Sequence, residues 1–408
     1  MIRYLIVLGT LFKTLLLSAQ HVLPVQMDTS YLKHELIVNA QGEYSANAIQ
    51  RQLAQQLLFG GYIDQGMKDL SFAKHRSANR IGGELGGEIE YRNFCDSLFR
   101  PRFGWVLKAG YANYASAVYS KDLFGLAFYG NEQYLGTSAE FSGTKFNYCG
   151  WLKLGFGLVD KKSKSSVSLN LYGITNYAQG ELQTGSLYQT ESGDSLHIDV
   201  QGTVDFTTGN SFLKGYGVGV DADIRIPVQI IGDHISYVQI LAKNIGVGFL
   251  SSPATRYDLN TSIGFKGFTF DELIGSSSLF SATSNWKDTL GLDSTTVKPT
   301  FFLPGFIQAG KMIDEMNTSK LQAFYGFHIY PSMMYNPLLY IGGQWKTTKW
   351  LNVGIHGSYG GYSGLRIGMY SQLIVKQIHL SIGSEDLLGF FSKKASGQSI
   401  LFRLRCVF

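Results

Sequence analysis

The last ten residues of the chain, 399–408, alternate between apolar and cationic side chains. The apolar parity holds Phe402, Leu404, Cys406 and Phe408. The other parity carries Arg403 and Arg405. Because successive side chains of a β-strand point to opposite faces, this segment predicts a strand with one oily face and one cationic face. Such a strand suits the wall of a membrane barrel, and it also suits a half-buried terminal strand of a soluble sheet, so the rest of the sequence has to decide between them.

Composition extends this pattern to the whole sequence. Of the 408 residues, 45% are hydrophobic and only 16% are charged, whereas a soluble domain carries about 25% charged residues. Beyond the N-terminus, no apolar run reaches the roughly 18 residues that a membrane-spanning helix needs. Low charge with apolar residues at alternate positions predicts a transmembrane β-barrel. The 48 glycines suit strands whose backbones bend or approach closely.

The N-terminus reads as an export signal. A short basic start, Met1–Arg3, precedes a mostly apolar stretch over residues 4–17, and the small pair Ser18-Ala19 follows. This order is typical of a secretory signal peptide, so we predict that residues 1–19 are one. The apolar span is too short for a transmembrane anchor. Export and the barrel pattern together predict the bacterial outer membrane as the location.

The sequence offers little covalent or redox chemistry. Cys95, Cys149 and Cys406 make an odd and widely spaced set, which argues against a disulfide framework and a zinc site. No G-x-S-x-G, H-E-x-x-H or Walker-type motif occurs. We therefore predict no enzyme activity, no cofactor and no metal, and interpret His328 and His356 as polar residues of a lumen or rim. The net charge of +5 is dispersed, so nucleic acid is not a predicted partner.

One segment near the N-terminus has a helical period. Ile49, Leu53 and Leu57 recur every four residues over 46–58, and Gly60-Gly61 ends the run. A second helical piece is predicted over 64–72. Because their polar backbones and glutamines cannot face lipid, we place these helices either in the lumen as a plug or in the periplasm. Residues 20–80 are thus predicted as an N-terminal helical segment.

From Ile81 onward the period is two. Ile81–Arg92 and Tyr216–Val228 are the clearest strands, and both are near the roughly 9–11 residues that a tilted membrane strand needs. Similar runs continue to the C-terminus. Their number predicts an all-β fold, a transmembrane antiparallel β-barrel of about 14 strands over residues 81–408, since single-chain bacterial barrels have even strand numbers. Residues 183–210 and 268–299 are interpreted as long polar loops.

Charged residues on the polar parity define two candidate lumen sites. If Ile81–Arg92 is the first strand, barrel closure brings it beside the last strand, because open edges cannot be left in lipid. We then expect a charge ladder that fixes the register of the seam and grips the plug. Its members would be Glu84, Glu88, Glu90, Arg403 and Arg405. Asp221, Asp223 and Arg225 share one face of their strand and predict a second lumen network.

The closing segment itself resembles the last strand of outer-membrane β-barrels, whose terminal aromatic is read by the assembly machinery. On this resemblance we interpret its apolar parity as an assembly signal. The residues concerned are Phe402, Leu404, Cys406 and Phe408.

Several short segments carry a wider resemblance. They are Gly60–Gln65, Asn79–Gly82, Asp122–Asn131, Gly215–Asp221, Leu303-Pro304 and Ser384–Phe390. In this order along the chain they resemble a family of Bacteroidota outer-membrane proteins of unknown function. That family is distantly similar to FadL-type transport barrels and to barrels of the type IX secretion system. The resemblance implies a monomeric barrel of about 14 strands with an N-terminal segment in its lumen, and it implies no catalytic residues.

Two functions are compatible with these features. The first is a passive conduit, narrow or plugged, for small or hydrophobic solutes. The alternative is a structural or docking barrel, without transport of its own, attached to a secretion or envelope-assembly system. The predicted partners are outer-membrane lipids and lipopolysaccharide, the barrel-assembly machinery and, in the second case, secretion-system components.

Overall fold

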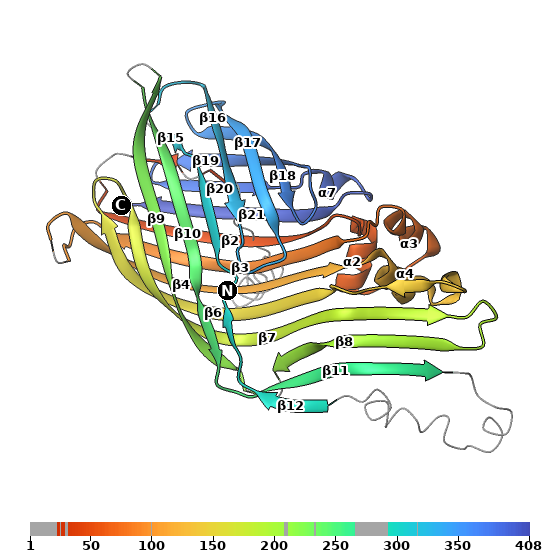
Figure 1. Ribbon diagram of the computed structural model, residues 1–408. Coiled ribbons are helices and arrows are strands. Elements are labelled where there is room, and N and C mark those ends of the chain that lie inside the picture. The colour runs from red at the N-terminus through yellow and green to blue at the C-terminus, as the bar shows by residue number, and fades with distance from the viewer. Residues whose placement is uncertain are drawn as a thin grey trace, which may run out of the picture.

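The fold is a closed antiparallel barrel of 14 strands (Figure 1). The computed structural model describes residues 23–24, 26–28, 32–98, 100–207, 211–231, 234–265, 293–315 and 317–408. The predicted signal peptide lies outside these residues. The wall strands, in order around the cylinder, are β2 (His34–Ala46), β3 (Asn79–Asn93), β4 (Phe103–Tyr119), β6 (Lys145–Asp160), β7 (Ser166–Gln189), β9 (Gly215–Ile231), β10 (His234–Leu250), β14 (Phe306–Lys311), β16 (Leu321–Ile329), β17 (Asn336–Lys346), β18 (Leu351–Gly361), β19 (Arg366–Val375), β20 (Ile378–Ser384) and β21 (Gly397–Val407).

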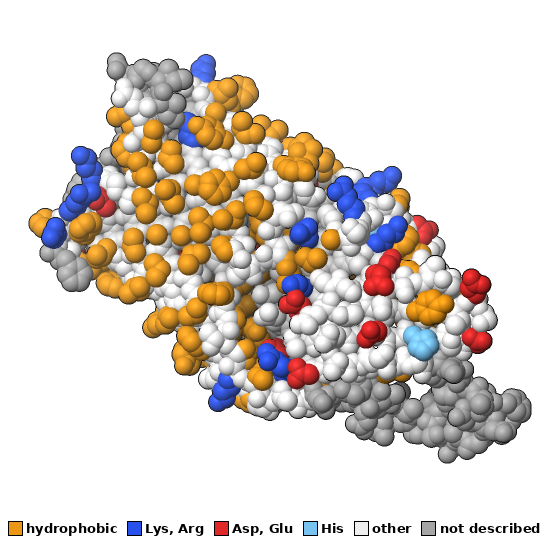
Figure 2. Space-filling model, in the orientation of Figure 1, with side chains coloured by type: hydrophobic (Ala, Val, Ile, Leu, Met, Phe, Trp, Pro, Cys, Tyr) orange, Lys and Arg blue, Asp and Glu red, His pale blue; other side chains and the backbone are white. Residues whose placement is uncertain are grey.

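Alternation sorts the side chains of the wall into two environments. On β7, Ser168 and Asn170 are 1% and 2% exposed, whereas Leu169 and Leu171 are 71% and 67% exposed. The outward apolar side chains form a broad belt on the face seen in Figure 2. Exposed apolar surface of this extent is the surface that a bilayer covers, so the predicted transmembrane barrel is confirmed. No helix among the described residues is long and apolar enough to cross a membrane.

The two ends of the barrel differ. At one end, the turn end, the connections are short, and the chain finishes there with His34 N–H donating to Phe408 O at 2.7 Å. The opposite end, the helix end, carries α2 (Arg51–Phe59), α3 (Gln65–Phe72), α4 (Lys121–Tyr129), α7 (Leu388–Phe391), the short 3₁₀ helix η1 (Glu132–Tyr134) and the short strand β5 (Ser138–Glu140).

The first strand of the barrel is β2 and not the predicted Ile81–Arg92. β2 pairs along its length with β21, and Glu35 faces Val407 while Ser45 faces Gly397. The predicted boundary at Ile81 is therefore wrong. β2 is difficult to recognise in the sequence because some of its outward positions hold small residues, such as Ala40 and Gly42. In addition, the apolar Ile37 at an inward position breaks the alternation.

The predicted helices exist, but they lie neither in the lumen nor ahead of the barrel. α2 and α3 connect β2 to β3 at the helix end, and α2 stops where Gly60 adopts a φ of 80°. With α4 they form a collar whose apolar core, including Leu53 and Phe124, packs on Tyr44, Ile81 and Tyr119. These three belong to the outward parity of their strands, so the collar covers the outside of the rim. The predicted placement in the lumen is therefore wrong, whereas the predicted placement in the periplasm stays a prediction.

A small sheet continues the wall beyond the helix end. The second half of β7 pairs with β8 (Leu196–Thr207), which pairs with β11 (Ala254–Phe265), and β12 (Asp293–Val297) lies at the far edge. We call this sheet the wing; it projects past the cylinder in Figure 1. The prediction of a loop over 183–210 is wrong for 183–207. Most of the predicted loop 268–299 lies outside the described residues.

A short N-terminal segment occupies the lumen. Its described residues are 23–24 and 26–28, and we call it the strap. β1 (Gln26–Met27) pairs in parallel with β15 (Ile313–Asp314), which follows β14 at the turn end, while β13 (Thr300–Phe302) precedes β14 and pairs with β10. Met27 is 1% exposed. The strap is extended and not helical, and it is no part of the wall.

Candidate functional site

Within the part of the chain that the structure describes, the lumen gathers many buried polar side chains, and it holds two clusters. The ionic cluster comprises Glu35, Glu88, Glu90, Arg92, Lys108, Lys153, Asp221, Asp223, Arg225, Lys243, Glu315 and Arg405. The aromatic cluster comprises Tyr114, Trp151, Tyr172, Phe306, Phe324, Tyr330, Tyr335, Tyr340, Tyr362 and Tyr370. Both arise from inward positions of the wall strands, joined by side chains from a few connections.

The first part of the ionic cluster centres on two carboxylates. Lys153 Nζ lies 2.6 Å from Glu88 Oε2 and 2.7 Å from Asp221 Oδ2. Lys243 Nζ lies 2.6 Å from Glu88 Oε1, and Lys108 Nζ lies 2.9 Å from Asp221 Oδ2. Each carboxylate thus binds two lysines. This arrangement compensates the desolvation that a buried charge would otherwise suffer.

The second part is built from arginines. Arg92 lies among three carboxylates, with Nε 2.6 Å from Glu90 Oε1, Nη1 3.4 Å from Glu35 Oε2 and Nη2 3.4 Å from Asp223 Oδ2. Arg225 Nη2 lies 2.7 Å from Asp223 Oδ2. Arg405 Nε lies 2.6 Å from Glu35 Oε1. Planar guanidinium groups suit such multiple contacts, because each presents several donors in a fixed geometry.

The predicted charge ladder at the seam is wrong. Arg403 and Arg405 lie on β21 opposite β2, where their partners in register are Asn39 and Ile37. β2 separates the acidic residues of β3 from β21. Glu88 and Glu90 bind lysines and Arg92 as described above, while Glu84 accepts from Gln41 and from the Tyr330 hydroxyl.

The second predicted network lies in the lumen, and its three members do not form a closed group. Asp223 and Arg225 bind one another, whereas Asp221 binds Lys108 and Lys153 on other strands. The predicted assembly residues Phe402, Leu404 and Cys406 lie on the parity of β21 opposite the buried Leu401, and Phe408 packs on His34 with ring centroids 5.6 Å apart. That the assembly machinery reads them stays a prediction.

Sequence reasoning missed most of the cations that complete the ionic cluster. Lys108 and Lys153 each lie inside a strand with strong alternation, on the parity opposite its exposed leucines. Lys243 lies on the parity opposite the exposed Ile240, beside a register shift of β10. A lysine on the inward parity of a membrane strand is therefore a signal that could have found them. Asp28 and Glu315 gave no such signal, because they lie outside the wall strands.

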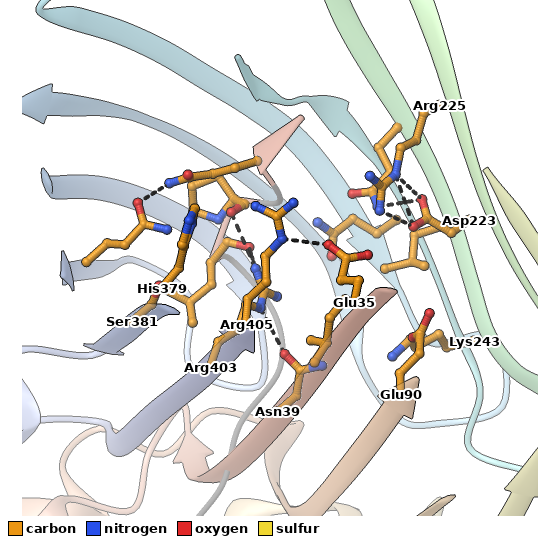
Figure 3. A pocket seen from close by; sticks show the side chains of 18 of the residues that line it. Glu35, Asn39, Glu90, Asp223, Arg225, Lys243, His379, Ser381, Arg403 and Arg405 are labelled. Carbon is orange, nitrogen blue, oxygen red and sulfur yellow. Dashed lines mark hydrogen bonds and ion pairs between the residues drawn. The ribbon is translucent and has the colours of Figure 1, made fainter. Parts of the chain in front are cut away.

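A cavity of about 90 Å³ lies between the ionic cluster and the strap. Figure 3 shows Arg403 and Arg405 on β21, with Glu35 and Asn39 of β2 in front of them and Asp223 and Arg225 across the cavity. The strap closes one side of this cavity through Leu23, Pro24 and Gln26.

The strap is held by side-chain contacts. Asp28 Oδ2 lies 3.1 Å from Arg405 Nη2. Gln26 Nε2 donates to Gln344 Oε1 at 3.3 Å and also to Gln372. Met27 O accepts from the backbone N–H of Glu315 at 3.1 Å.

The aromatic cluster is completed by the connection between β16 and β17, residues 330–335, which turns inward at the helix end. The Tyr330 hydroxyl donates to Glu84 Oε2 at 2.7 Å, and Ser332 Oγ donates to Leu303 O at 2.8 Å. Ser116 Oγ lies 3.7 Å from Met333 Sδ. Tyr114 stacks on Trp151 with centroids 4.8 Å apart. This inward connection narrows the lumen above the ionic cluster.

The described residues of the two clusters form no metal-binding group. No group of three or more His, Cys, Asp or Glu side chains that could hold a metal occurs among the described residues. The predicted rim histidines are buried: His328 lies against Phe306, with centroids 4.7 Å apart, and His356 lies 6.2 Å from the Phe324 ring. Neither histidine forms part of a described nucleophile–base pair. The clusters can bind and exclude solutes.

Comparisons with known proteins give folds alone. No family model matches the sequence, and no curated protein matches it. Among solved structures, the chain is similar to a deletion mutant of the monoaromatic hydrocarbon channel TodX, with 9% identity and a TM-score of 0.43, covering 93% of this chain and 91% of that one. It is similar to the Pseudomonas putida toluene transporter TodX, with 10% identity and a TM-score of 0.31 over 92% and 87%. It is also similar to the translocator domain of the autotransporter NalP from Neisseria meningitidis, with 7% identity and a TM-score of 0.27 over 92% and 89%.

Proposed function

We propose that this protein is an outer-membrane channel for small solutes, closed at rest by its strap and narrowed by the inward connection 330–335. Barrels of this class have short periplasmic turns and longer extracellular loops. The turn end, with the strap and Phe408, is then periplasmic, and the collar and wing face the exterior.

The observation that carries the proposal is that the strap fills the lumen without belonging to the wall. β2 and β21 close the cylinder by themselves. Withdrawing the strap breaks its side-chain contacts and the two-residue pairing with β15, while every pairing of the wall remains. The energy needed to open the periplasmic side is therefore separate from the energy that holds the barrel together.

The inward connection is a second barrier, and it too can move without breaking the pairing of the wall strands. Residues 330–335 join β16 to β17 at the helix end, so a shift of this segment leaves the pairing of those strands intact. Solutes entering from outside would meet aromatic faces first and charged groups second. A route of this order favours small solutes that have an apolar body.

Planar-bilayer recordings test the channel directly. The full-length protein is expected to be nearly silent, and a variant that lacks residues 23–28 is expected to give steady unitary steps. The matched control removes the wing tip, residues 187–198, which lies outside the lumen and should leave the recordings as silent as those of the full-length protein. A strapless variant that folds and stays silent would contradict the proposal.

The wing favours a second candidate function, that of a docking barrel. It extends β7, β8 and β11 beyond the cylinder, where a partner could contact it without touching the lumen. For a docking barrel, removal of residues 187–198 should abolish co-purification of an envelope protein, and removal of residues 23–28 should not.

A further inference from the structure

Arg403 differs from the other guanidinium groups of the lumen in its partners. It lies in the wall of the cavity, and its contacts are neutral: Nε donates to Asn39 Oδ1 at 2.8 Å, and Nη1 lies 3.4 Å from both Leu23 O and Pro24 O. Among the described residues, no carboxylate lies within ion-pair distance of Arg403. A cation taken out of bulk water without an anionic partner is a site that attracts one.

The neighbouring arginine shows what Arg403 lacks. Arg405, two residues along the same face, binds three carboxylates, Glu35, Glu315 and Asp28. The described residues that line the cavity include five cations and four carboxylates. The cations are Arg92, Arg225, Lys243, Arg403 and Arg405, and the carboxylates are Glu35, Glu90, Asp223 and Glu315. Among the described residues, Arg403 is the one of these five cations that has no carboxylate within ion-pair distance.

The strap supplies the acceptors that an anionic ligand would bring. Two of its carbonyl oxygens face Arg403 at 3.4 Å, which is long for a hydrogen bond, and its Asp28 carboxylate lies on Arg405. Carbonyl oxygens at this distance compensate a guanidinium less than a carboxylate in bidentate contact. A free carboxylate would therefore compete with the strap for this position.

The rest of the cavity indicates the body of the ligand. Ile37, Leu241, Phe306 and Tyr370 line it beside Arg403. We propose that this cavity binds small carboxylates with a compact apolar body and that the strap occupies the site as an internal competitor. The inference rests on the proposed channel function, whose solute class it names. Binding of the solute and withdrawal of the strap are then two descriptions of one equilibrium.

The test measures binding to the full-length protein in detergent by calorimetry, with benzoate as the probe and benzamide as its neutral analogue. Benzoate should bind, and benzamide should bind at least about tenfold more weakly, as expected for losing a charge-assisted contact. Arg403→Gln should weaken benzoate to a similar degree, and Arg403→Lys should restore part of the loss. Arg102→Gln, a change at an exposed arginine of the turn end, should leave the affinity unchanged.

Two further variants separate competition by the strap from a general effect of charge. Asp28→Asn removes the ion pair between strap and wall, so benzoate affinity should rise about threefold as the open state becomes more populated. Glu315→Gln removes the same charge beside Arg405 and leaves Asp28 in place, so its effect should be smaller. Equal gains in both variants, or equal binding of benzoate and benzamide, would overturn the inference. Strapless channels that conduct but bind no benzoate would overturn the carboxylate site and leave the channel standing.

Discussion

The two clusters of the lumen are built in opposite ways. Most of the ionic cluster comes from wall strands, and its charges bind one another between strands, as Lys153 of β6 does with Glu88 of β3 and Asp221 of β9. The aromatic cluster depends on a connection, because Tyr330, Met333 and Tyr335 come from residues 330–335. We conclude that the ionic cluster is part of the barrel framework, whereas the aromatic cluster can rearrange without opening the wall.

Charge reversal in the ionic cluster should have the largest effect on stability. Arg405→Glu places a fourth carboxylate beside Glu35, Glu315 and Asp28, and we expect a loss of about 3–5 kcal/mol, typical of breaking a buried pair. The measurement is the heat-modifiable folded fraction on cold gels after refolding into detergent.

Arg403→Glu is the matched control for this reversal. It changes the charge equally, two residues away on the same face, where no described carboxylate is bound. It should reduce the folded fraction less than Arg405→Glu. Equal losses in the two variants would mean that net lumen charge, and not the specific pairs, stabilises the barrel.

A mutation that creates a cavity in the aromatic cluster should reduce stability less than charge reversal in the ionic cluster, and it should change conduction more. Met333→Ala removes a buried side chain from the inward connection, and we expect a loss of about 2 kcal/mol, at the low end for such truncations because a connection can relax. In the strapless variant, this change should raise unitary conductance.

Met369→Ala on the outward face is the control, since that side chain is 40% exposed on the lipid side. It should leave conductance unchanged. If Met333→Ala also left conductance unchanged, the connection 330–335 would not be a barrier, and the contrast between the clusters would fail.

The smallest expected effect on stability concerns the collar, which lies outside both clusters. His75 is buried between α3 and β4, with Nδ1 2.8 Å from Ser71 O and Nε2 3.1 Å from the Tyr119 hydroxyl. Burial lowers the pKa of His75 below 6.5. As the pH falls from about 6.5 towards the lowered pKa, the unfolded form gains the proton first, so the collar loses stability; above pH 7 this contribution is fully present.

Hydrogen exchange of α2 and α3 as a function of pH measures this loss. The protection factor, which is the ratio of the intrinsic to the observed exchange rate and so corrects for the intrinsic pH dependence of amide exchange, should fall below pH 6.5 in the wild type and be nearly independent of pH in a His75→Gln variant. The wall strands should show no such change. An acid-induced loss of protection that survives in His75→Gln would place its origin elsewhere.

Much of the architecture could be predicted from the sequence. The alternation of Tyr216–Val228 predicts an inward Asp221 and an outward Val220, and both positions agree with the structure. The strand number also agrees. The seam could not be predicted in the same way, because β2 has a weak alternation that a neighbouring helical pattern obscures.

The partners of the lumen charges could not be predicted either. Glu88 binds Lys153 and Lys243, which are 65 and 155 residues away along the chain. Parity places each of these residues inside the barrel, but distance along the strand and the stagger between strands decide which of them meet. The position of the strap could not be predicted for the same reason, since its pairing with β15 depends on the shape of the closed lumen.

The sequence by itself determined which side chains face lipid and which face the interior, because alternation with period two is a local property of each strand. Only the tertiary structure decided that β2 closes the cylinder, that the helices cover its outer rim and that Arg403 has no anionic partner among the residues that the structure describes. Those outcomes depend on closure of the whole sheet, which brings together residues that no local pattern relates.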